Sequence, residues 1–94
     1  MEPPSAPAAV WSVYLLRCAD GTYYAGSTTD TEARAAAHNA GRGARYTSGR
    51  RPVTMVYVEA CGSRSAALTR EHALKRLTRA GKEALAGATP ARRG

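Results

Sequence analysis

Hydrophobic residues first gather in residues 11–17, where both faces of an extended chain carry apolar side chains. The two sets are Trp11, Val13 and Leu15 on one face, and Tyr14 and Leu16 on the other. This pattern is typical of a β-strand that is covered on both sides. Residues 19–21 (Ala-Asp-Gly) are a turn signal, and residues 22–27 are a second β-prone run. Residues 12–27 are therefore predicted to form a β-hairpin.

The alanine-rich segment after the hairpin has the pattern of a helix. Thr29 followed by Glu32 has the form of a capping box, and the acidic first turn suits the positive end of the helix dipole. The helix should end near Gly41. Its predicted inward stripe consists only of small side chains, so whatever packs against it should come close. The stripe is Ala33, Ala36, Ala37 and Ala40.

The second half of the chain predicts a loop, a third strand and a longer helix. The loop covers residues 41–52, and residues 53–59 alternate as a strand does. The two faces of that strand are Val53, Met55 and Tyr57 against Val56 and Val58. A helix should then begin at Ser63 or Ser65 and run to about residue 79, with Gly81 interrupting it and residues 82–86 adding a last turn. Its expected inward side chains are Leu68, Leu74 and Leu77.

This order of elements, ββαβαα, favours an α+β fold over a doubly wound sheet. A length of 94 residues is about 0.6 of an average domain, so one domain is expected. We place it at residues 11–86, between a disordered leader rich in proline (residues 1–10) and a basic tail (residues 87–94).

The charge balance adds a candidate class of partner. The chain has 14 basic and 7 acidic residues and a net charge of +7, which points to polyanions such as DNA or RNA, although many small basic proteins bind neither. No apolar run approaches the 18 or so residues of a membrane span, so no membrane partner is expected. The first residues lack the features of a signal peptide, and the isolated Cys18 and Cys61 suit neither a disulfide framework nor a zinc site. A cytoplasmic location is therefore predicted.

Few side chains could carry catalysis. Glu71 lies inside the last long helix, where it must reach solvent, pair with a base such as Lys75, or hold a metal ion. Arg34 and His38 lie one turn apart, off the alanine stripe, and could either grip a phosphate or occupy a solvated surface. The strand tyrosines could equally be packing residues. From these residues alone the alternatives stay open.

Taken in order, however, these positions resemble a known family. The residues concerned are Ser12-Val13-Tyr14, Tyr24-Ala25-Gly26, the Arg34…His38-Asn39 helix and the later Glu71. In this order they resemble the GIY-YIG nuclease family. Residues 43–47 and 51–53 look like its small stand-alone bacterial members, the YhbQ/YazA-like group. The resemblance covers about residues 11–86 and implies a small three-stranded antiparallel sheet flanked by helices.

The resemblance implies metal-dependent hydrolysis of phosphodiester bonds in nucleic acid, with DNA as the expected substrate and Mg²⁺ or Mn²⁺ as the expected cofactor. It makes Glu71 the metal ligand and lets Arg34 grip a phosphate oxygen. Tyr14 is expected to act as general base, Tyr24 to orient the water and His38 to help the proton leave, although other divisions of these three roles stay open. The five side chains should converge on one surface cleft.

Binding of nucleic acid is expected from a basic surface formed by residues 42–51 and the last long helix. Its candidate contact residues are Arg42, Arg45, Arg50, Arg51 and Lys75, and Gly26 is assigned a structural role. Full nucleases of the family carry a separate DNA-binding domain, so a protein partner that supplies substrate specificity is a further expectation. The alternative function is a non-catalytic nucleic-acid-binding module, or a partner-dependent subunit, that keeps the nuclease fold.

The register of the hairpin decides which tyrosines share a face. A two-residue Asp20-Gly21 turn would put Tyr14 beside Tyr23, whereas a three-residue loop that begins at Ala19 would pair Tyr14 with Gly26 and leave Tyr24 on the same face. Because the chemistry implied by the family needs both tyrosines on one face, we predict the three-residue loop with Gly21 at positive φ. Gly26 should then leave space opposite Tyr14 for a phosphate.

Overall fold

The sheet is built around β1, which pairs with β2 on one side and β3 on the other in antiparallel fashion. The computed structural model describes residues 10–88. In chain order its elements are β1 (Trp11–Arg17), β2 (Tyr23–Thr28), α1 (Thr31–Asn39), α2 (Arg45–Ser48), β3 (Thr54–Cys61), α3 (Arg64–Lys75) and α4 (Arg79–Ala88). The predicted α+β class, three-stranded antiparallel sheet and element order are confirmed. The single turn of α2 lies inside the predicted loop 41–52.

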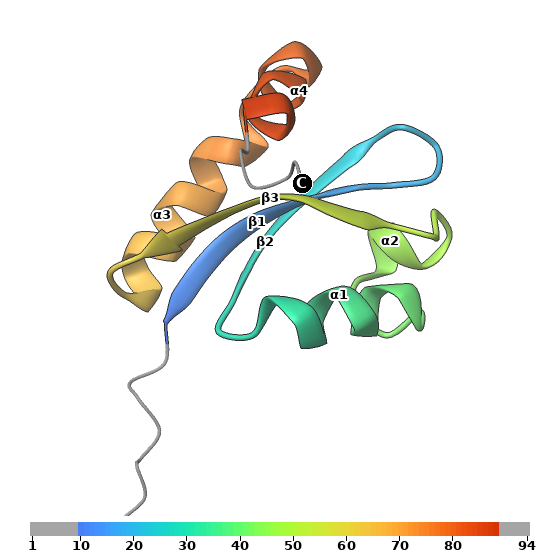
Figure 1. The fold of residues 1–94 in the computed structure, drawn as a ribbon, viewed down its shortest axis with the longest axis horizontal. Helices are drawn as coiled ribbons and strands as arrows, with labels where there is room; N and C mark the ends of the chain where they lie inside the picture. Colours follow the sequence, from blue (N-terminus) through green and yellow to red (C-terminus); the bar gives the residue numbers. More distant parts are fainter. Residues whose placement is uncertain (1–9, 89–94) are drawn as a thin grey trace, which may run out of the picture.

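Helices cover both faces of this sheet, α3 and α4 on one and α1 and α2 on the other (Figure 1). The alternation along β1 divides the core accordingly. Toward α3 it places Val13 and Leu15 with Ala25 and Leu74, and toward α1 it places Tyr14 and Leu16 with Cys18 and Val53. Full burial of one leucine side chain contributes about 1.5–3 kcal/mol. A strand with four consecutive buried residues is therefore the anchor of the fold.

The predicted hairpin register is confirmed. Tyr14 pairs with Gly26 and Leu16 with Tyr24. The backbone N–H of Cys18 donates to the carbonyl of Thr22 (2.8 Å), which closes a three-residue loop, and Gly21 has φ of 86°. Glycine adopts this left-handed conformation without the steric cost that a Cβ brings. Tyr14 and Tyr24 consequently share the face that α1 and α2 cover.

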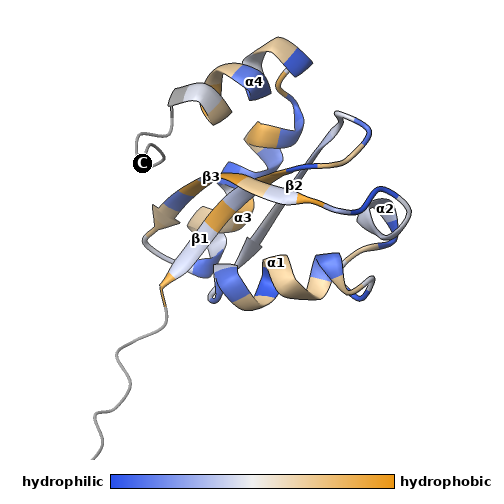
Figure 2. Cartoon of the chain, turned by 45° about the vertical axis from the view of Figure 1, so that its right-hand side comes forward, coloured by the Kyte–Doolittle hydropathy of each residue, from blue (hydrophilic) through white to orange (hydrophobic). Residues whose placement is uncertain are grey.

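The predicted packing of the first helix is wrong. Asp30, not Thr29, is its N-cap, and its carboxylate accepts from the backbone N–H of Ala33 (3.0 Å). The face that meets the sheet carries the buried His38 and the half-buried Arg34, whereas Ala36 and most of the alanine stripe face solvent. The ribbon of α1 accordingly carries hydrophobic and hydrophilic stretches side by side (Figure 2). Of the four alanines predicted to pack inward, only Ala37 is partly buried.

The predicted strict alternation of the third strand is also wrong. Leu15 pairs with Tyr57, but the next residue, Leu16, pairs with Met55, so a bulge leaves Val56 as an extra residue on β3. The bulge turns Tyr57 toward α3 while Met55 stays on the face of Tyr14. Val58, which the alternation placed on the same face as Val56, is exposed.

The C-terminal helices differ from the prediction in their ends and in their inward residues. Ser63 caps α3, as one of the two predicted alternatives, but the helix ends at Lys75. The Thr78 hydroxyl accepts from the backbone N–H of Gly81 (3.0 Å), so Gly81 belongs to a second helix rather than interrupting the first. Leu74 is buried as predicted, but two leucines expected beside it are exposed. These are Leu68 and Leu77.

The predicted segments at the two ends fall mainly outside the described residues. Residues 1–9 of the predicted leader and 89–94 of the predicted tail are not described. α4 continues to Ala88, past the predicted domain boundary at residue 86. Within residues 10–88 no helix is both long enough and apolar enough to cross a membrane.

Candidate active site

A buried chain of hydrogen bonds runs between the central strand and the two helices beneath it. The Tyr14 hydroxyl lies 3.2 Å from Nε2 of His38, and Nδ1 of the same ring lies 2.7 Å from Oγ1 of Thr47. The Thr47 hydroxyl also donates to the backbone carbonyl of Ala44 (3.1 Å). All three side chains are at most 2% exposed. Polar groups buried this deeply destabilise the fold unless they are paired. These hydrogen bonds therefore hold β1, α1 and α2 in one arrangement.

Burial and neighbouring charges set the protonation of this pair. Burial lowers the pKa of His38, and the positive charge of Arg34 lowers it further, so the imidazole is neutral at pH 7. Burial also raises the pKa of Tyr14 well above its usual value of 10.0, with Tyr24 and Glu71 adding to the rise and Arg34 opposing it. Tyr14 therefore keeps its proton in the resting protein.

Two glycines let these rings approach the backbone. A Cβ at Gly26 would lie 2.6 Å from Cζ of Tyr14 and collide with its hydroxyl. A Cβ at Gly43 would lie 2.7 Å from Cε1 of His38 and closer still to other ring atoms. The expected space for a phosphate at Gly26 is thus filled by the Tyr14 ring, and that expectation is wrong.

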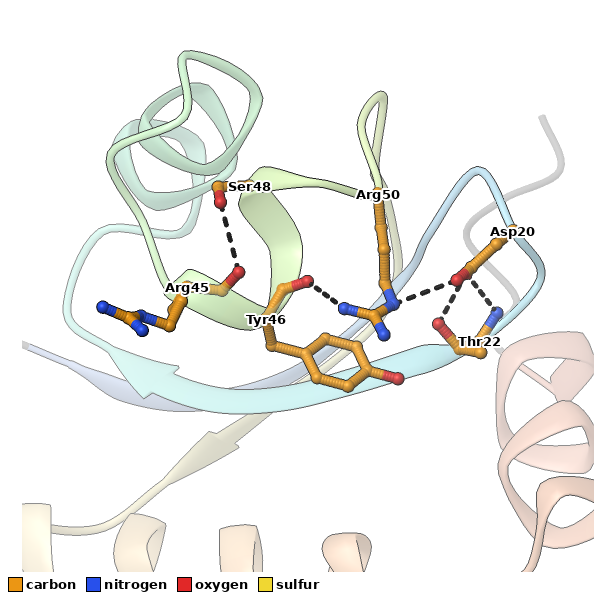
Figure 3. A network of polar contacts seen from close by, with 6 residues as sticks. All are labelled: Asp20, Thr22, Arg45, Tyr46, Ser48 and Arg50. Atoms are coloured by element: carbon orange, nitrogen blue, oxygen red, sulfur yellow. Dashed lines mark hydrogen bonds and ion pairs between the residues drawn. The ribbon is translucent and has the colours of Figure 1, made fainter.

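A stack of rings extends the site toward the hairpin tip. The Tyr24 ring centroid lies 5.3 Å from that of His38 and 5.9 Å from that of Tyr46, and the guanidinium of Arg50 lies 4.0 Å over the Tyr46 ring. Arg50 also donates to the carboxylate of Asp20 (3.0 Å) and to the Tyr46 carbonyl (2.7 Å), as Figure 3 shows. Tyr24 is held from both sides, with its ring beside the imidazole.

Arg34 supplies a positive charge close to the buried pair. It is half-buried on α1 and lines a hollow at the start of that helix with Thr28 and Asp30. Within residues 10–88, no side chain or backbone group forms a hydrogen bond or ion pair with its guanidinium. Its charge nonetheless acts on both His38 and Tyr14. A guanidinium of this kind is available to bind a phosphate in bidentate fashion.

Glu71 approaches from the opposite face of the sheet, at the edge formed by β2. Its Oε1 accepts from the Ser27 hydroxyl (2.9 Å), and its Oε2 lies 3.1 Å from Nζ of Lys75. The carboxylate is 17% exposed and close enough to act on the pKa of Tyr14. Of the alternatives left open for Glu71, the pair with Lys75 is present.

The fit of a divalent cation can be tested on these contacts. Among the described residues, no three His, Cys, Asp or Glu side chains gather as a metal cage. Mg²⁺ does not require one, since one or two carboxylates with waters and substrate phosphates often suffice. A carboxylate has about four lone-pair positions, and Ser27 and Lys75 leave some of them free at Glu71. The residues present therefore fit a single-carboxylate site.

The four arginines and one lysine that were predicted to contact nucleic acid come from opposite sides of the sheet. Arg42 and Arg45 are exposed on the side of α1 and α2, and the side chain of Arg45 points away from the network in Figure 3. Arg51 donates to the backbone carbonyls of Ser48 (2.8 Å) and Asn39 (3.3 Å). Arg50 holds Asp20 and Tyr46, as above, while Lys75 lies on α3, across the sheet. Arg50, Arg51 and Lys75 thus already have partners within the fold.

Sequence reasoning gave no role to three residues of this region. Thr47 and Gly43 both contact the His38 ring, and both lie in the segment 43–47 that carried part of the family resemblance. Asn39, next to His38, donates to the Val53 carbonyl (3.0 Å) and accepts from its N–H (2.7 Å), which fixes the entry to β3. The segment itself was the available signal, because it carried family-like residues to which no role had been given.

Comparison with known proteins identifies the family. The model of the GIY-YIG catalytic domain matches residues 10–84. The chain belongs to the GIY-YIG family. A UPF0213 protein of Halobacterium salinarum is 56% identical over 73 residues, which cover 78% of this chain and 95% of the relative. A UPF0213 protein of Staphylococcus haemolyticus is 51% identical over 67 residues, covering 71% and 82%. The relatives of this YhbQ/YazA-like group therefore occur in archaea as well as bacteria.

A solved structure agrees with this assignment. The solution NMR structure of the UPF0213 protein from Bacillus halodurans has a TM-score of 0.55 and 38% identity, and the match covers 88% of each chain. Membership of this family makes the domain a nuclease-type domain. The names of its UPF0213 relatives assign them no substrate, metal or partner.

Proposed function

We propose that this chain is a metal-dependent endonuclease that hydrolyses phosphodiester bonds in DNA. The observation that carries the proposal is the contact between the Tyr14 hydroxyl and the neutral, buried imidazole of His38, beside the guanidinium of Arg34, which has no hydrogen-bond or ion-pair partner among residues 10–88. A proton acceptor next to a phosphate-binding cation is the pair of functions that phosphodiester hydrolysis by water requires.

Each of these residues has a distinct task in the proposal. Arg34 binds two non-bridging oxygens of the scissile phosphate and offsets the charge that grows in the transition state. Tyr14 and His38 take up the proton of the attacking water. Tyr24, held between Tyr46 and His38, orients that water.

Glu71 is the residue that would hold Mg²⁺ or Mn²⁺. A bound divalent cation supplies charge stabilisation of the phosphate and of the leaving oxygen. Without the cation, Ser27 and Lys75 orient the Glu71 carboxylate. Titration with Mn²⁺ alone tests this assignment without any assay of activity, because the paramagnetic ion should broaden the NMR signals of Glu71 and Ser27 first and leave those of Glu71→Gln much less affected.

A cleavage assay tests the activity itself. We would incubate single-stranded, duplex and branched DNA with the wild-type protein in Mg²⁺, in Mn²⁺ and with a chelator, beside Glu71→Ala. Cleavage by the wild type that needs the metal and is lost in the variant supports the proposal. Equal products from the two proteins would contradict it.

A second function is favoured by the state of Glu71. Its carboxylate accepts from Ser27 and pairs with Lys75, and these two contacts account for its position without a metal ion. On this alternative the chain is a non-catalytic nucleic-acid-binding module, or a subunit that needs a protein partner to place its substrate. Binding of DNA without cleavage, by wild type and Glu71→Ala alike, would select this alternative.

Both functions require binding of DNA through the exposed cations. Arg42 and Arg45 project from the side of the sheet that carries Tyr14 and have no partner to lose among the described residues. If about four to six phosphates are contacted, the logarithm of the binding constant should fall with the logarithm of salt concentration at a slope of roughly −3 to −5. Binding that does not respond to salt would argue against nucleic acid as the ligand.

A further inference from the structure

We propose that Thr47 is a positioning residue that holds the imidazole proton of His38 on Nδ1, so that His38, through Nε2, is the final proton acceptor and Tyr14 only relays the proton. This inference rests on the proposed function. It concerns Thr47, to which the proposed function gives no task.

The tautomer follows from counting protons and acceptors in the buried chain. Three protons must be placed, those of the Tyr14 hydroxyl, the His38 ring and the Thr47 hydroxyl. Three acceptors lie within reach, namely Nε2 of His38, Oγ1 of Thr47 and the carbonyl of Ala44. With the ring proton on Nδ1, the imidazole donates to Thr47, Thr47 donates to Ala44, and Tyr14 donates to Nε2, so that every proton is bound.

The opposite tautomer leaves a donor without a partner. If Nε2 carried the proton it would donate to the Tyr14 oxygen, and the Tyr14 proton would then have no acceptor among the described residues. In the resting protein Tyr14 is 2% exposed, so bulk water does not serve as that acceptor, and the attacking water reaches Tyr14 only when the phosphate is bound. A buried donor without a partner costs far more than an unused lone pair on a carbonyl.

This arrangement defines a balanced proton path. As the oxygen of the attacking water bonds to phosphorus and the bond from phosphorus to the leaving oxygen breaks, a proton of that water passes to the Tyr14 hydroxyl. The original Tyr14 proton passes at the same time to Nε2 of His38. The resulting imidazolium keeps its Nδ1 proton on Thr47, and solvent protonates the leaving oxygen.

The path removes a difficulty of using Tyr14 as the base. Burial holds the pKa of Tyr14 too high for a resting tyrosinate at neutral pH. A relay needs no tyrosinate, because Tyr14 gains one proton as it gives up another. His38 faces Arg34 on its own helix, Tyr14 on β1 and Tyr24 on β2, while Glu71 of α3 acts on Tyr14.

The first test reads the tautomer directly and needs no nuclease activity. Long-range ¹H–¹⁵N NMR spectra distinguish a protonated ring nitrogen from a bare one. Wild type and Thr47→Ser, which keeps the hydroxyl, should show His38 protonated on Nδ1, whereas Thr47→Val should show a mixture or the Nε2 form. Thr54→Val, which changes an exposed threonine of β3, is the matched control and should leave the His38 signals unchanged.

The second test measures cleavage of DNA by the same proteins. Thr47→Val should lower kcat by tenfold or more, because a wrongly placed ring proton blocks transfer from Tyr14. KM should change by less than about twofold, since Thr47 is fully buried and touches no substrate. Thr47→Ser should restore most of kcat, and the rate should fall with acidity as His38 takes up its proton.

The outcomes separate the inference from the proposed function. A wild-type protein with His38 protonated on Nε2 overturns the inference whether or not the protein cleaves DNA. An unchanged tautomer and kcat in Thr47→Val overturn it as well. A wild-type protein that has the Nδ1 tautomer and cleaves no DNA overturns the proton path together with the proposed function, and leaves only the role of Thr47 in setting the tautomer.

Discussion

Replacement of Gly26 by alanine should destabilise the protein strongly, although the change adds only one methyl group to an edge strand. The new Cβ would lie 2.6 Å from Cζ and 3.2 Å from Cε1 of Tyr14. Carbon atoms in contact settle at about 3.5–4.0 Å, so the ring must retreat by roughly 1 Å. Its hydroxyl is already 3.2 Å from Nε2 of His38, so that retreat breaks the buried hydrogen bond.

The magnitude follows from these two effects. Overpacking of this kind costs about 1–3 kcal/mol. A buried hydroxyl and imidazole that lose each other cost about 1–3 kcal/mol more, against a gain of about 0.4–1 kcal/mol from the stiffer unfolded chain. The net loss of about 1–5.6 kcal/mol should lower Tm by roughly 4–45 °C in a domain of this size.

Thermal unfolding followed by circular dichroism measures the effect. Gly49→Ala is the matched control, because a Cβ there meets nothing within 4 Å and its φ of −95° suits alanine. In a Tyr14→Leu background, which removes Cζ and the hydroxyl, most of the Gly26→Ala penalty should disappear. A Gly26→Ala protein that melts within about 2 °C of wild type would refute the reasoning, since the loss of even 1 kcal/mol shifts Tm by about 4–8 °C.

Three further predictions concern charges. Arg34→Ala and Glu71→Ala should each reduce cleavage of DNA by tenfold or more while changing its affinity far less, and a variant with wild-type rates would remove that residue from the catalytic set. Arg42→Ala and Arg45→Ala should each reduce the salt slope of DNA binding by about 1 without slowing cleavage at saturating DNA, as measured by fluorescence anisotropy and initial rates. Burial, and then the Arg34 charge, lowers the pKa of His38. Below about pH 6.5, His38 therefore takes up a proton in the unfolded chain more readily than in the folded chain. The free energy of unfolding, measured with urea between about pH 7.5 and 5.5, should therefore fall with acidity, and a flat profile contradicts the burial of a neutral His38.

The hairpin and the division of the core could be predicted from the sequence. Asp20-Gly21 suits a two-residue turn as well as a three-residue loop, so the register was predicted from the family resemblance, which needs Tyr14 and Tyr24 on one face, and the observed register places them there. The alternation of apolar residues along 11–17 correctly divides the core between the two faces. The register also requires a small residue at position 26, because the Tyr14 ring lies against the backbone there.

The sequence was insufficient where a buried polar contact reverses the usual polarity of a helix. Periodicity places the alanines of α1 inward and its charged residues outward, but here the polar face of Arg34 and His38 meets the sheet. The orientation of α1 follows from the Tyr14 hydroxyl, a buried polar group that needs a hydrogen-bond partner and finds it in the His38 imidazole. The bulge at Val56 is likewise absent from the residue pattern, because it follows from how β3 fits both Leu15 and Leu16.

The position of this candidate site inside the core ties its chemistry to stability. Tyr14, His38 and Thr47 are among the most buried residues of the described chain, and together they join β1 to α1 and α2. A truncation at any of them leaves buried polar atoms unpaired, and at Tyr14 or His38 it also removes a group of the proposed proton path. Loss of cleavage in such a variant cannot by itself separate catalysis from folding, whereas substitutions that keep shape, such as Thr47→Ser against Thr47→Val, can. The same coupling predicts that natural variation at Tyr14, His38 and Thr47 is confined to changes that keep the hydrogen bonds, because any other change destabilises the fold whatever it does to cleavage.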